Sequence, residues 1–188
     1  KRYPEYAWYL ATQQVDYDVF ASSYYPAWHG TLDNLANVLN TVAEQYGKKT
    51  MIAETAYANT LEDTDFYGNT GTDAVKPYPF TEQGQANNMS NLFDLAVNKM
   101  TNCIGVFYWE GTWISVGGET WEENSKLWEE HGSGWASSYA AAYDPKDAGQ
   151  YYGGCSVDNQ AFFDKDGHAI ESLKVFALMR EGNFTPIV

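Results

Sequence analysis

The chain has 188 residues, of which 44% are hydrophobic and 16% aromatic, and no run of 18 apolar residues, so it fits one globular domain and argues against a membrane-spanning role. Eleven Lys and Arg stand against 25 Asp and Glu, and the resulting net charge of −14 would repel the phosphate backbone of nucleic acids. With 15 Tyr and 7 Trp but only 19% charged residues, the composition favours an uncharged amphipathic ligand such as a sugar.

The N-terminal quarter of the chain predicts a strand, a loop and a helix. The first residues, KRYPEYAWYLATQQ, lack the basic start, apolar core and cleavage site of a signal peptide, and read like a chain entered midway. Residues 15–23 are rich in β-formers and lead into the turn-prone YYPAWHG. Thr31 can cap a helix that ends at Gly47, because apolar residues recur between them at three- and four-residue steps.

The middle of the chain predicts a second strand and a second helix. Residues 50–56, TMIAETA, form a buried-looking strand that the charge of Glu54 interrupts near its end. A polar loop rich in Asn, Asp, Gly and Thr is expected over residues 57–80. Thr81 then opens a helix whose apolar stripe runs to Met100.

A third apolar strand is expected over residues 103–109, CIGVFYW, where Glu110 and a Trp-bearing loop close it. The stretch from 111 to 167 has no sustained period, although WEENSKLWEEH and SSYAAAYD could hold helical turns. A last helix is expected over residues 172–180.

The alternation of strands and helices is typical of right-handed βαβ units in a parallel sheet. Because the strand ends carry Tyr25, Glu54 and Glu110, the pattern favours a (β/α)8 TIM barrel over a doubly wound sheet. Three strands cannot close a barrel, which takes roughly 250 residues. Residues 1–188 are therefore predicted to be an α/β partial barrel, the C-terminal portion of one catalytic domain whose N-terminal strands lie outside this chain. A small three-stranded α/β domain is the alternative, with an unexplained bare sheet edge.

Glu54 is the most informative residue, because a carboxylate in an apolar strand must be paired, hydrogen-bonded or functional. A retaining glycosidase needs a nucleophilic carboxylate roughly 5 Å from a second carboxyl group. Glu54 fits the role of the nucleophile. Glu110 is a candidate for the second carboxyl group, or else for a hydrogen-bonding or structural group. A structural ion pair is the alternative for Glu54.

Aromatic side chains accompany these acids in the predicted loops. Trp28, Trp109 and Trp113 could stack on sugar rings. His29 could donate to a sugar hydroxyl or brace its own loop. The remaining tryptophans are expected in the core or over loops: Trp8, Trp121, Trp128 and Trp135.

The second loop contains the pattern D-x-D-x-Y-x-N, formed by Asp63, Asp65, Tyr67 and Asn69. Carboxylate and amide oxygens are the ligands that Ca²⁺ prefers, but the Gly and Glu positions of an EF-hand are missing. A solvated acidic loop is the alternative interpretation of this pattern. The sequence shows no zinc cluster, no glycine-rich nucleotide turn and no G-x-S-x-G motif.

A family resemblance rests on four long segments: YDVFASSYYPAWHGTLDNL, MIAETAY, GVFYWEGTWISVG and GSGWASSYAAAYDPKDAGQYYGGCSVDNQAFFD. Together they resemble glycoside hydrolase family 53, the arabinogalactan endo-β-1,4-galactanases, over nearly the whole chain. The resemblance implies a (β/α)8 fold in which residues 17–23, 50–56 and 103–109 are strands six, seven and eight. It also implies retaining hydrolysis of β-1,4-galactan, the side chain of type I arabinogalactan in pectin, by a secreted, extracellular enzyme.

The same resemblance implies roles for single residues. The nucleophile corresponds to Glu54, and Tyr25, or else Tyr24, orients it. The acid/base glutamate belongs to strand four, outside this chain, so Glu110 loses that role and the 188 residues are expected to be inactive without the missing N-terminal half of the barrel. The residues that would line the sugar cleft are Trp28, His29, Trp109 and Glu110.

Bacterial members of the family also imply a Ca²⁺ site that joins the loops after strands seven and eight. Its ligands would be Asp63, Asp65, the Tyr67 carbonyl, Asn69, the Cys155 carbonyl and Asp158. Tyr67 replaces a more usual His and Cys155 a Ser, which matters little if only backbone oxygens bind. The loop over residues 117–128 departs from the family pattern.

Two other classes of function stay open at this point. A noncatalytic sugar-binding module could keep the aromatic cleft without the other strands. A structural α/β domain would use Glu54 only for an ion pair.

Overall fold

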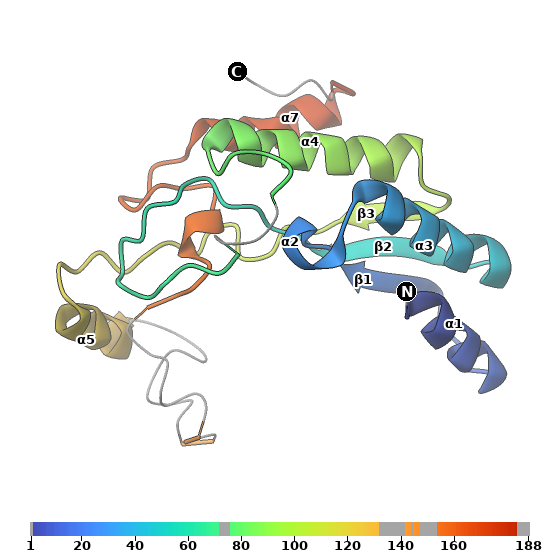
Figure 1. Cartoon of the computed structure of the whole chain (residues 1–188), viewed down its shortest axis with the longest axis horizontal. Coiled ribbons are helices and arrows are strands. Elements are labelled where there is room, and N and C mark those ends of the chain that lie inside the picture. The colour runs from blue at the N-terminus through green and yellow to red at the C-terminus, as the bar shows by residue number, and fades with distance from the viewer. Residues whose placement is uncertain (1, 72–75, 132–141, 144, 147–153, 184–188) are drawn as a thin grey trace.

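A three-stranded parallel sheet organises the chain (Figure 1). The computed structural model describes residues 2–71, 76–131, 142–143, 145–146 and 154–183. The strands β1 (Val19–Ser23), β2 (Lys49–Glu54) and β3 (Cys103–Val106) lie in that order, joined by helix α3 (Leu32–Tyr46) and helix α4 (Glu82–Asn98). The three predicted strands and the two helices between them are confirmed.

The sequence also marks correctly the start of both crossover helices and the end of α3. The Thr31 hydroxyl accepts a hydrogen bond from the backbone N–H of Asn34, and α3 ends at Gly47 in the left-handed conformation, with φ +64°. The Thr81 hydroxyl accepts from the backbone N–H of Gly84 in the same way. Local side-chain chemistry therefore fixes where these helices begin.

The remaining elements are shorter and only partly foreseen: α1 (Tyr3–Thr12), α2 (Pro26–His29), α5 (Trp121–His131), the 3₁₀ turns η3 (Asp158–Gln160) and η4 (Glu171–Lys174), and α7 (Val175–Arg180). Helix α5 confirms the helical turns expected in WEENSKLWEEH, and η4 with α7 forms the expected last helix. Nearly all of SSYAAAYD lies outside the described residues. Helices α1 and α2 were not predicted.

The core lies between the sheet and helices α1, α3 and α4, which contribute to one apolar cluster with β1 and β2. Its fully buried members include Ala7, Leu39, Ile52 and Leu92. Ala21, on the other face of the sheet, is exposed. In the part of the chain that the structure describes, no helix contributes to a cluster on that face. A sheet with helices on one face and its strand-end loops at one end is the arrangement of part of a (β/α)8 barrel.

The tryptophans divide into core and surface. Trp128 is 4% exposed, as predicted, and Trp121 stacks on Tyr67 with ring centroids 6.0 Å apart. The core prediction for Trp8 is wrong: it is 59% exposed on α1. Trp135 lies outside the described residues. None of the helices in the described ranges is long and apolar enough to cross a bilayer.

Candidate active site

A β-bulge in β2 aims Glu54 away from the helices. Ser22 of β1 pairs with Ile52, but the next residue, Ser23, pairs with Glu54, so Ala53 is an extra residue in β2. Ile52 is completely buried in the cluster under the helices. Strict alternation would place Glu54 on the same face as Ile52, whereas the bulge places it beside Ser23 on the opposite face.

Tyr25 holds the Glu54 carboxylate. The Tyr25 hydroxyl donates to Glu54 Oε2 at 3.1 Å, linking the segment after β1 to the end of β2. Burial raises the pKa of Tyr25, and so do the hydrogen bond and the negative charge of Glu54, so this phenol stays protonated at neutral pH. Tyr24 points elsewhere, because its hydroxyl donates to the Gly30 carbonyl at 2.9 Å. Of the two tyrosines that the sequence left open, the structure therefore places Tyr25 on Glu54.

The turn after β1 fixes the protonation of His29. The backbone N–H of Tyr25 donates to His29 Nδ1 at 2.9 Å, so a neutral His29 carries its proton on Nε2. Burial lowers the pKa of His29, although the charge of Glu54 acts in the opposite sense. Trp28 is 58% exposed and packs edge-on against Tyr25, with ring centroids 5.3 Å apart. Helix α2 thus presents an indole face and an imidazole N–H beside Glu54.

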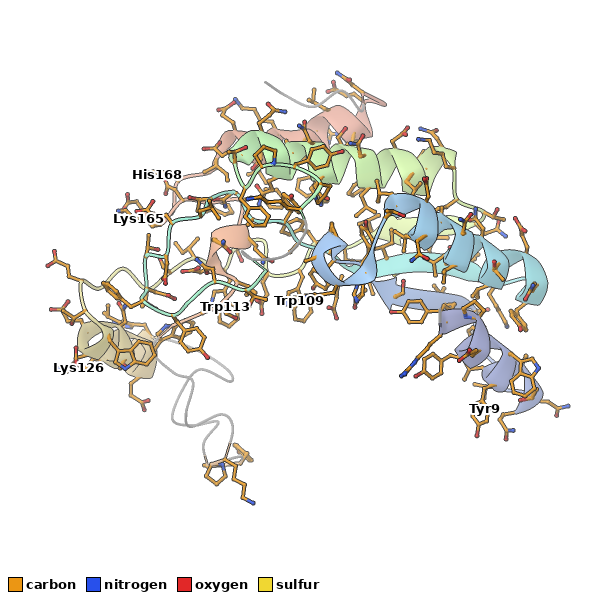
Figure 2. All side chains as sticks on the ribbon, viewed as in Figure 1. Tyr9, Trp109, Trp113, Lys126, Lys165 and His168 are labelled. Atoms are coloured by element: carbon orange, nitrogen blue, oxygen red, sulfur yellow. The ribbon has the colours of Figure 1, made fainter. Side chains whose placement is uncertain are left out.

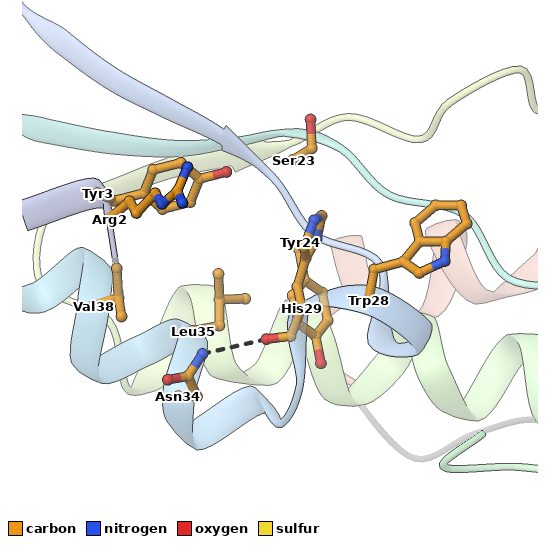
Figure 3. Close-up of a pocket in the computed structure, with 9 residues that line it drawn as sticks. All are labelled: Arg2, Tyr3, Ser23, Tyr24, Trp28, His29, Asn34, Leu35 and Val38. Atoms are coloured by element: carbon orange, nitrogen blue, oxygen red, sulfur yellow. Dashed lines mark hydrogen bonds between the residues drawn. The ribbon is translucent and has the colours of Figure 1, made fainter. Parts of the chain in front are cut away.

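Trp28 and His29 line a cavity of about 270 Å³ that Figure 3 shows between the end of β1, α2 and α3. Arg2 and Asn34 also line it, and the Asn34 side-chain amide donates to the His29 carbonyl at 3.2 Å. Glu110 and Trp113 line a separate hollow of about 580 Å³. Of the predicted cleft residues, Trp28 and His29 therefore line one hollow, Glu110 lines another, and Trp109 lines neither.

Trp109 and Glu110 come to Glu54 from β3. The backbone N–H of Trp109 donates to the Thr55 carbonyl at 2.8 Å, which ties this segment to the residue after Glu54. Trp109 is 46% exposed, and Figure 2 shows it with Trp113 among the loops at the strand ends. Burial and the charge of Glu54 raise the pKa of Glu110, whose backbone has φ +51°. A non-glycine residue in this region of φ is strained and is common at functional sites.

The candidate Ca²⁺ loop contains two buried carboxyl groups. Asp65 is fully buried and accepts hydrogen bonds from the backbone N–H groups of Tyr67 (2.9 Å) and Cys155 (2.6 Å). Asp158 is 7% exposed, and neither of its oxygens accepts a hydrogen bond from the described residues. Burial and the charges of Asp65 and Asp63 raise the pKa of Asp158 to about 8. The negative charge of the Asp65 and Asp158 carboxyl groups can be offset either by a proton held between them or by a bound cation.

The other proposed ligands are less buried than Asp65 and Asp158. Asp63 is exposed, and the Asn69 side-chain amide donates to the Glu62 carbonyl at 3.2 Å. A group of three or more Asp, Glu, His or Cys residues could hold a metal ion if its ligand atoms all lie within 4.8 Å of one another. Within the described ranges, the only such group is Asp164, Asp166 and His168, in an exposed turn. Asp65 and Asp158 thus form the buried part of the candidate site, and the ligand atoms of Asp63, Asp65 and Asp158 do not all lie within 4.8 Å of one another.

Sequence reasoning missed Gln85, a fully buried amide behind these loops. Its only sequence signal is position: Gln85 lies four residues before Met89, on the apolar stripe of α4. Its hydrogen bonds become visible only in the folded chain.

Comparisons with known proteins place the chain in a family. The model of glycosyl hydrolase family 53 matches residues 2–176. The chain is 54% identical over 185 residues to the endo-β-1,4-galactanase of Bacillus subtilis (strain 168), covering 97% of this chain and 43% of that protein. It is 37% identical over 118 residues to the arabinogalactan endo-β-1,4-galactanase of Cellvibrio japonicus (strain Ueda107), covering 61% of this chain and 31% of that protein.

Among solved structures, the GH53 catalytic domain of Ignisphaera aggregans superposes with a TM-score of 0.71 and 33% identity, covering 94% of this chain and 42% of that domain's chain. A fungal β-1,4-galactanase structure, with a TM-score of 0.55 and 20% identity over 93% of this chain and 44% of the other, shares the fold. The chain thus spans less than half the length of these relatives, and the partial barrel agrees with their architecture. On the family match over nearly its whole length and the identity to the Bacillus protein, the chain belongs to glycosyl hydrolase family 53.

Proposed function

We propose that this chain carries the nucleophile side of a retaining endo-β-1,4-galactanase that acts on β-1,4-galactan outside the cell. The observation that carries the proposal is the hydrogen bond from Tyr25 to Glu54 Oε2 at the adjoining ends of two parallel strands. Parallel-strand ends are where barrel enzymes place their catalytic residues. The substrate comes from the relatives, two of which are named as endo-β-1,4-galactanases.

The chemistry assigned to Glu54 is nucleophilic attack. Since Tyr25 occupies Oε2, Glu54 Oε1 attacks the anomeric carbon of a galactosyl unit, the glycosidic C–O bond breaks, and a second carboxylic acid protonates the leaving oxygen. Water, deprotonated by that second carboxylate, then hydrolyses the glycosyl ester and frees Glu54. Trp28 and Trp109 offer faces for sugar stacking, and the His29 Nε2–H can donate to a hydroxyl.

The sheet itself supports an incomplete barrel, with β1, β2 and β3 as strands six, seven and eight. On β3, Ile104 is 50% exposed, and Phe107 just beyond it is 60% exposed. On α1, Tyr6 and Tyr9 are 53% and 58% exposed, and Figure 2 shows Tyr9 at the outer side of that helix. Exposed large apolar side chains on an outer strand and on a helix fit packing surfaces for further parts of a barrel. The partner of this surface is proposed to be the N-terminal half of the barrel.

Tyr25→Phe tests the role of the tyrosine in the completed enzyme. Loss of one hydrogen bond to a charged carboxylate costs about 1.5–3 kcal/mol, so kcat/KM should fall by about 10–150-fold without loss of folding. Steady-state kinetics on galactan measure this change. Tyr24→Phe is the matched control, because that hydroxyl bonds a backbone carbonyl away from Glu54. Equal losses in both variants would contradict the assignment.

The 188 residues produced alone should hydrolyse no galactan, because the resemblance places the acid/base glutamate outside them. Adding a polypeptide with the five N-terminal strands should restore hydrolysis, measured as reducing ends released. The raised pKa of Glu110 would also suit an acid, so this residue provides the counter-test. Turnover by the isolated chain that disappears in Glu110→Gln would assign the acid role to Glu110 and overturn the proposal.

Calorimetry with galacto-oligosaccharides separates the rival binding module from the half enzyme. Binding by the isolated chain, with no hydrolysis even after the N-terminal half is added, would favour the module. Hydrolysis after complementation would favour the enzyme, whether or not the isolated chain binds sugar.

We also propose that Ca²⁺ joins the loops after β2 and β3. Asp65 and Asp158 would hold it directly, and Asp63, Asn69 and the carbonyls of Tyr67 and Cys155 would complete the oxygen set that Ca²⁺ requires. The support is the burial of two neighbouring carboxyl groups, one of which accepts no hydrogen bond from the described residues. Burial raises the pKa of the Cys155 thiol to about 12, and the charges of Asp158, Glu110 and Asp65 add to this shift. A bound cation would fix loop positions near the cleft.

A further inference from the structure

Gln85 is a fully buried amide in α4 whose hydrogen bonds reach four segments distant in sequence. Its Nε2 lies 2.9 Å from the Tyr57 carbonyl, 3.0 Å from the Gln160 carbonyl and 3.1 Å from the Ala161 carbonyl. Its Oε1 accepts a hydrogen bond from the Ser172 hydroxyl. The two N–H groups of the amide are therefore shared among several acceptors.

Tyr108 extends this network to the segment after β3. Its hydroxyl lies 3.1 Å from Gln85 Nε2, accepts from the backbone N–H of Tyr57 at 3.0 Å, and lies 2.7 Å from the Gln160 carbonyl. Burial raises the pKa of Tyr108, so the hydroxyl keeps its proton as a donor. The Tyr108 ring also packs on Phe162, with centroids 4.3 Å apart.

Three of the segments that meet at Gln85 also carry residues of the candidate site. Tyr57 is three residues after Glu54, Tyr108 immediately precedes Trp109, and Gln160 is two residues after Asp158. Helix α4 is the crossover between β2 and β3 and holds Gln85 through the capped turn at Thr81. Through the side chain of Gln85, helix α4 thus contacts three segments that follow or precede candidate site residues.

We propose that Gln85 is a positioning residue of the sugar cleft, which sets the segment that carries Trp109 and Glu110 against the strand end that carries Glu54. That the cleft binds a sugar rests on the proposed galactanase function, whereas the role of Gln85 in positioning these segments does not. Gln85 touches neither the substrate nor Glu54 and acts through Tyr57 and Tyr108. Because its bonds to the carbonyls of Tyr57 and Ala161 are buried, an apolar replacement would leave buried acceptors without this donor.

The test compares Gln85→Met with Asn88→Met in the 188-residue chain. Methionine has nearly the volume of glutamine but no N–H group. Asn88 is a suitable control because it lies on the same helix, is 4% exposed, and its side-chain nitrogen makes no hydrogen bond with the described residues. Amide hydrogen exchange is followed by NMR at two reporter protons. They are the backbone N–H of Tyr57, which donates to the Tyr108 hydroxyl, and the backbone N–H of Trp109, which donates to the Thr55 carbonyl.

The core amide of Val42 in α3 reports the change in global stability. Once that change is subtracted, both reporter protons should exchange about tenfold faster or more in Gln85→Met than in the wild type. Asn88→Met should show no such local difference. Gln85→Glu adds a pH signature, because the introduced carboxylic acid can donate one hydrogen bond when protonated and none when ionised. Relative to wild type at each pH, exchange at Tyr57 should therefore accelerate as pH rises through that titration.

Uniform acceleration at Tyr57, Trp109 and Val42 would overturn the proposal, because it would show only a loss of global stability. Unchanged exchange at Tyr57 and Trp109 would overturn it as well. A parallel titration with galactotetraose separates this inference from the proposed function. If the wild-type chain binds the sugar, Gln85→Met should bind it at least several-fold more weakly; if wild type does not bind, the exchange data still decide the role of Gln85.

Discussion

Glu54→Gln is expected to abolish galactan hydrolysis by the completed barrel, with kcat lowered about 10³-fold or more. The amide keeps the size of the side chain and can still accept from Tyr25, but it cannot form the glycosyl ester. Folding should be unaffected, since Glu54 lies at the free face of the sheet with Ser23 rather than in the core. Initial rates on galactan, with circular dichroism as a folding check, measure both quantities.

Chemical rescue distinguishes a nucleophile from a binding group. In Glu54→Ala, added azide can occupy the space of the missing carboxylate and attack the anomeric carbon, which gives a galactosyl azide of inverted configuration. Tyr25→Ala should show no such product, because it leaves the nucleophile in place. Full activity of Glu54→Gln, or an azide product of retained configuration, would remove Glu54 from the nucleophile role.

The elements that sequence predicted correctly are those with local causes. Thr31 and Thr81 cap their helices through hydrogen bonds to residues three positions along, and Gly47 ends α3 because it adopts positive φ readily. The three strands are short apolar runs bounded by turn residues, which is also a local signal. Helix α1 gave no such signal, because its large aromatic residues, among them Trp8, are spread around the helix and many are exposed.

The site depends on contacts between segments, and there the sequence was less informative. It marked Glu54 as unusual through its charge, but the bulge at Ala53 that aims this side chain is a matter of register with β1. It left Tyr24 and Tyr25 open, and the contact of Tyr25 with Glu54 spans 29 positions. The partners of Gln85 lie up to 87 positions away, so no local pattern could reveal them.

Removal of Ca²⁺ is expected to destabilise the chain. A cation that binds only the folded state at 100 times its Kd contributes about 2.7 kcal/mol, and for a chain of this length that corresponds to a fall in Tm of roughly 5–10 °C when EDTA is added. Differential scanning calorimetry in millimolar Ca²⁺ and in EDTA measures the shift. An unchanged Tm in both conditions would contradict the calcium proposal.

Variants locate the cation. Asp158→Asn removes the buried charge, so it should abolish the response to Ca²⁺ while leaving the EDTA-treated chain as stable as wild type or more so at pH 8. Asp164→Asn is the matched control, because Asp164 belongs to the exposed turn with Asp166 and His168. A Ca²⁺ response that survives Asp158→Asn and disappears in Asp164→Asn would move the cation to that turn.

The pH dependence follows from the sign of the Asp158 shift. Its pKa in the metal-free folded chain is about 8, above that of an unfolded aspartate, so the folded state binds the extra proton. Stability is therefore highest below the unfolded pKa and falls as pH rises from about 4 to about 8. Because Ca²⁺ binds the ionised carboxylates, the Tm shift that it produces should be larger at pH 8 than at pH 5. Asp158→Asn should weaken the pH dependence both of the stability and of the Tm shift caused by Ca²⁺. If Asp65 and Asp158 only share a proton and bind no cation, stability should still fall as pH rises, but Ca²⁺ should not raise the Tm at any pH.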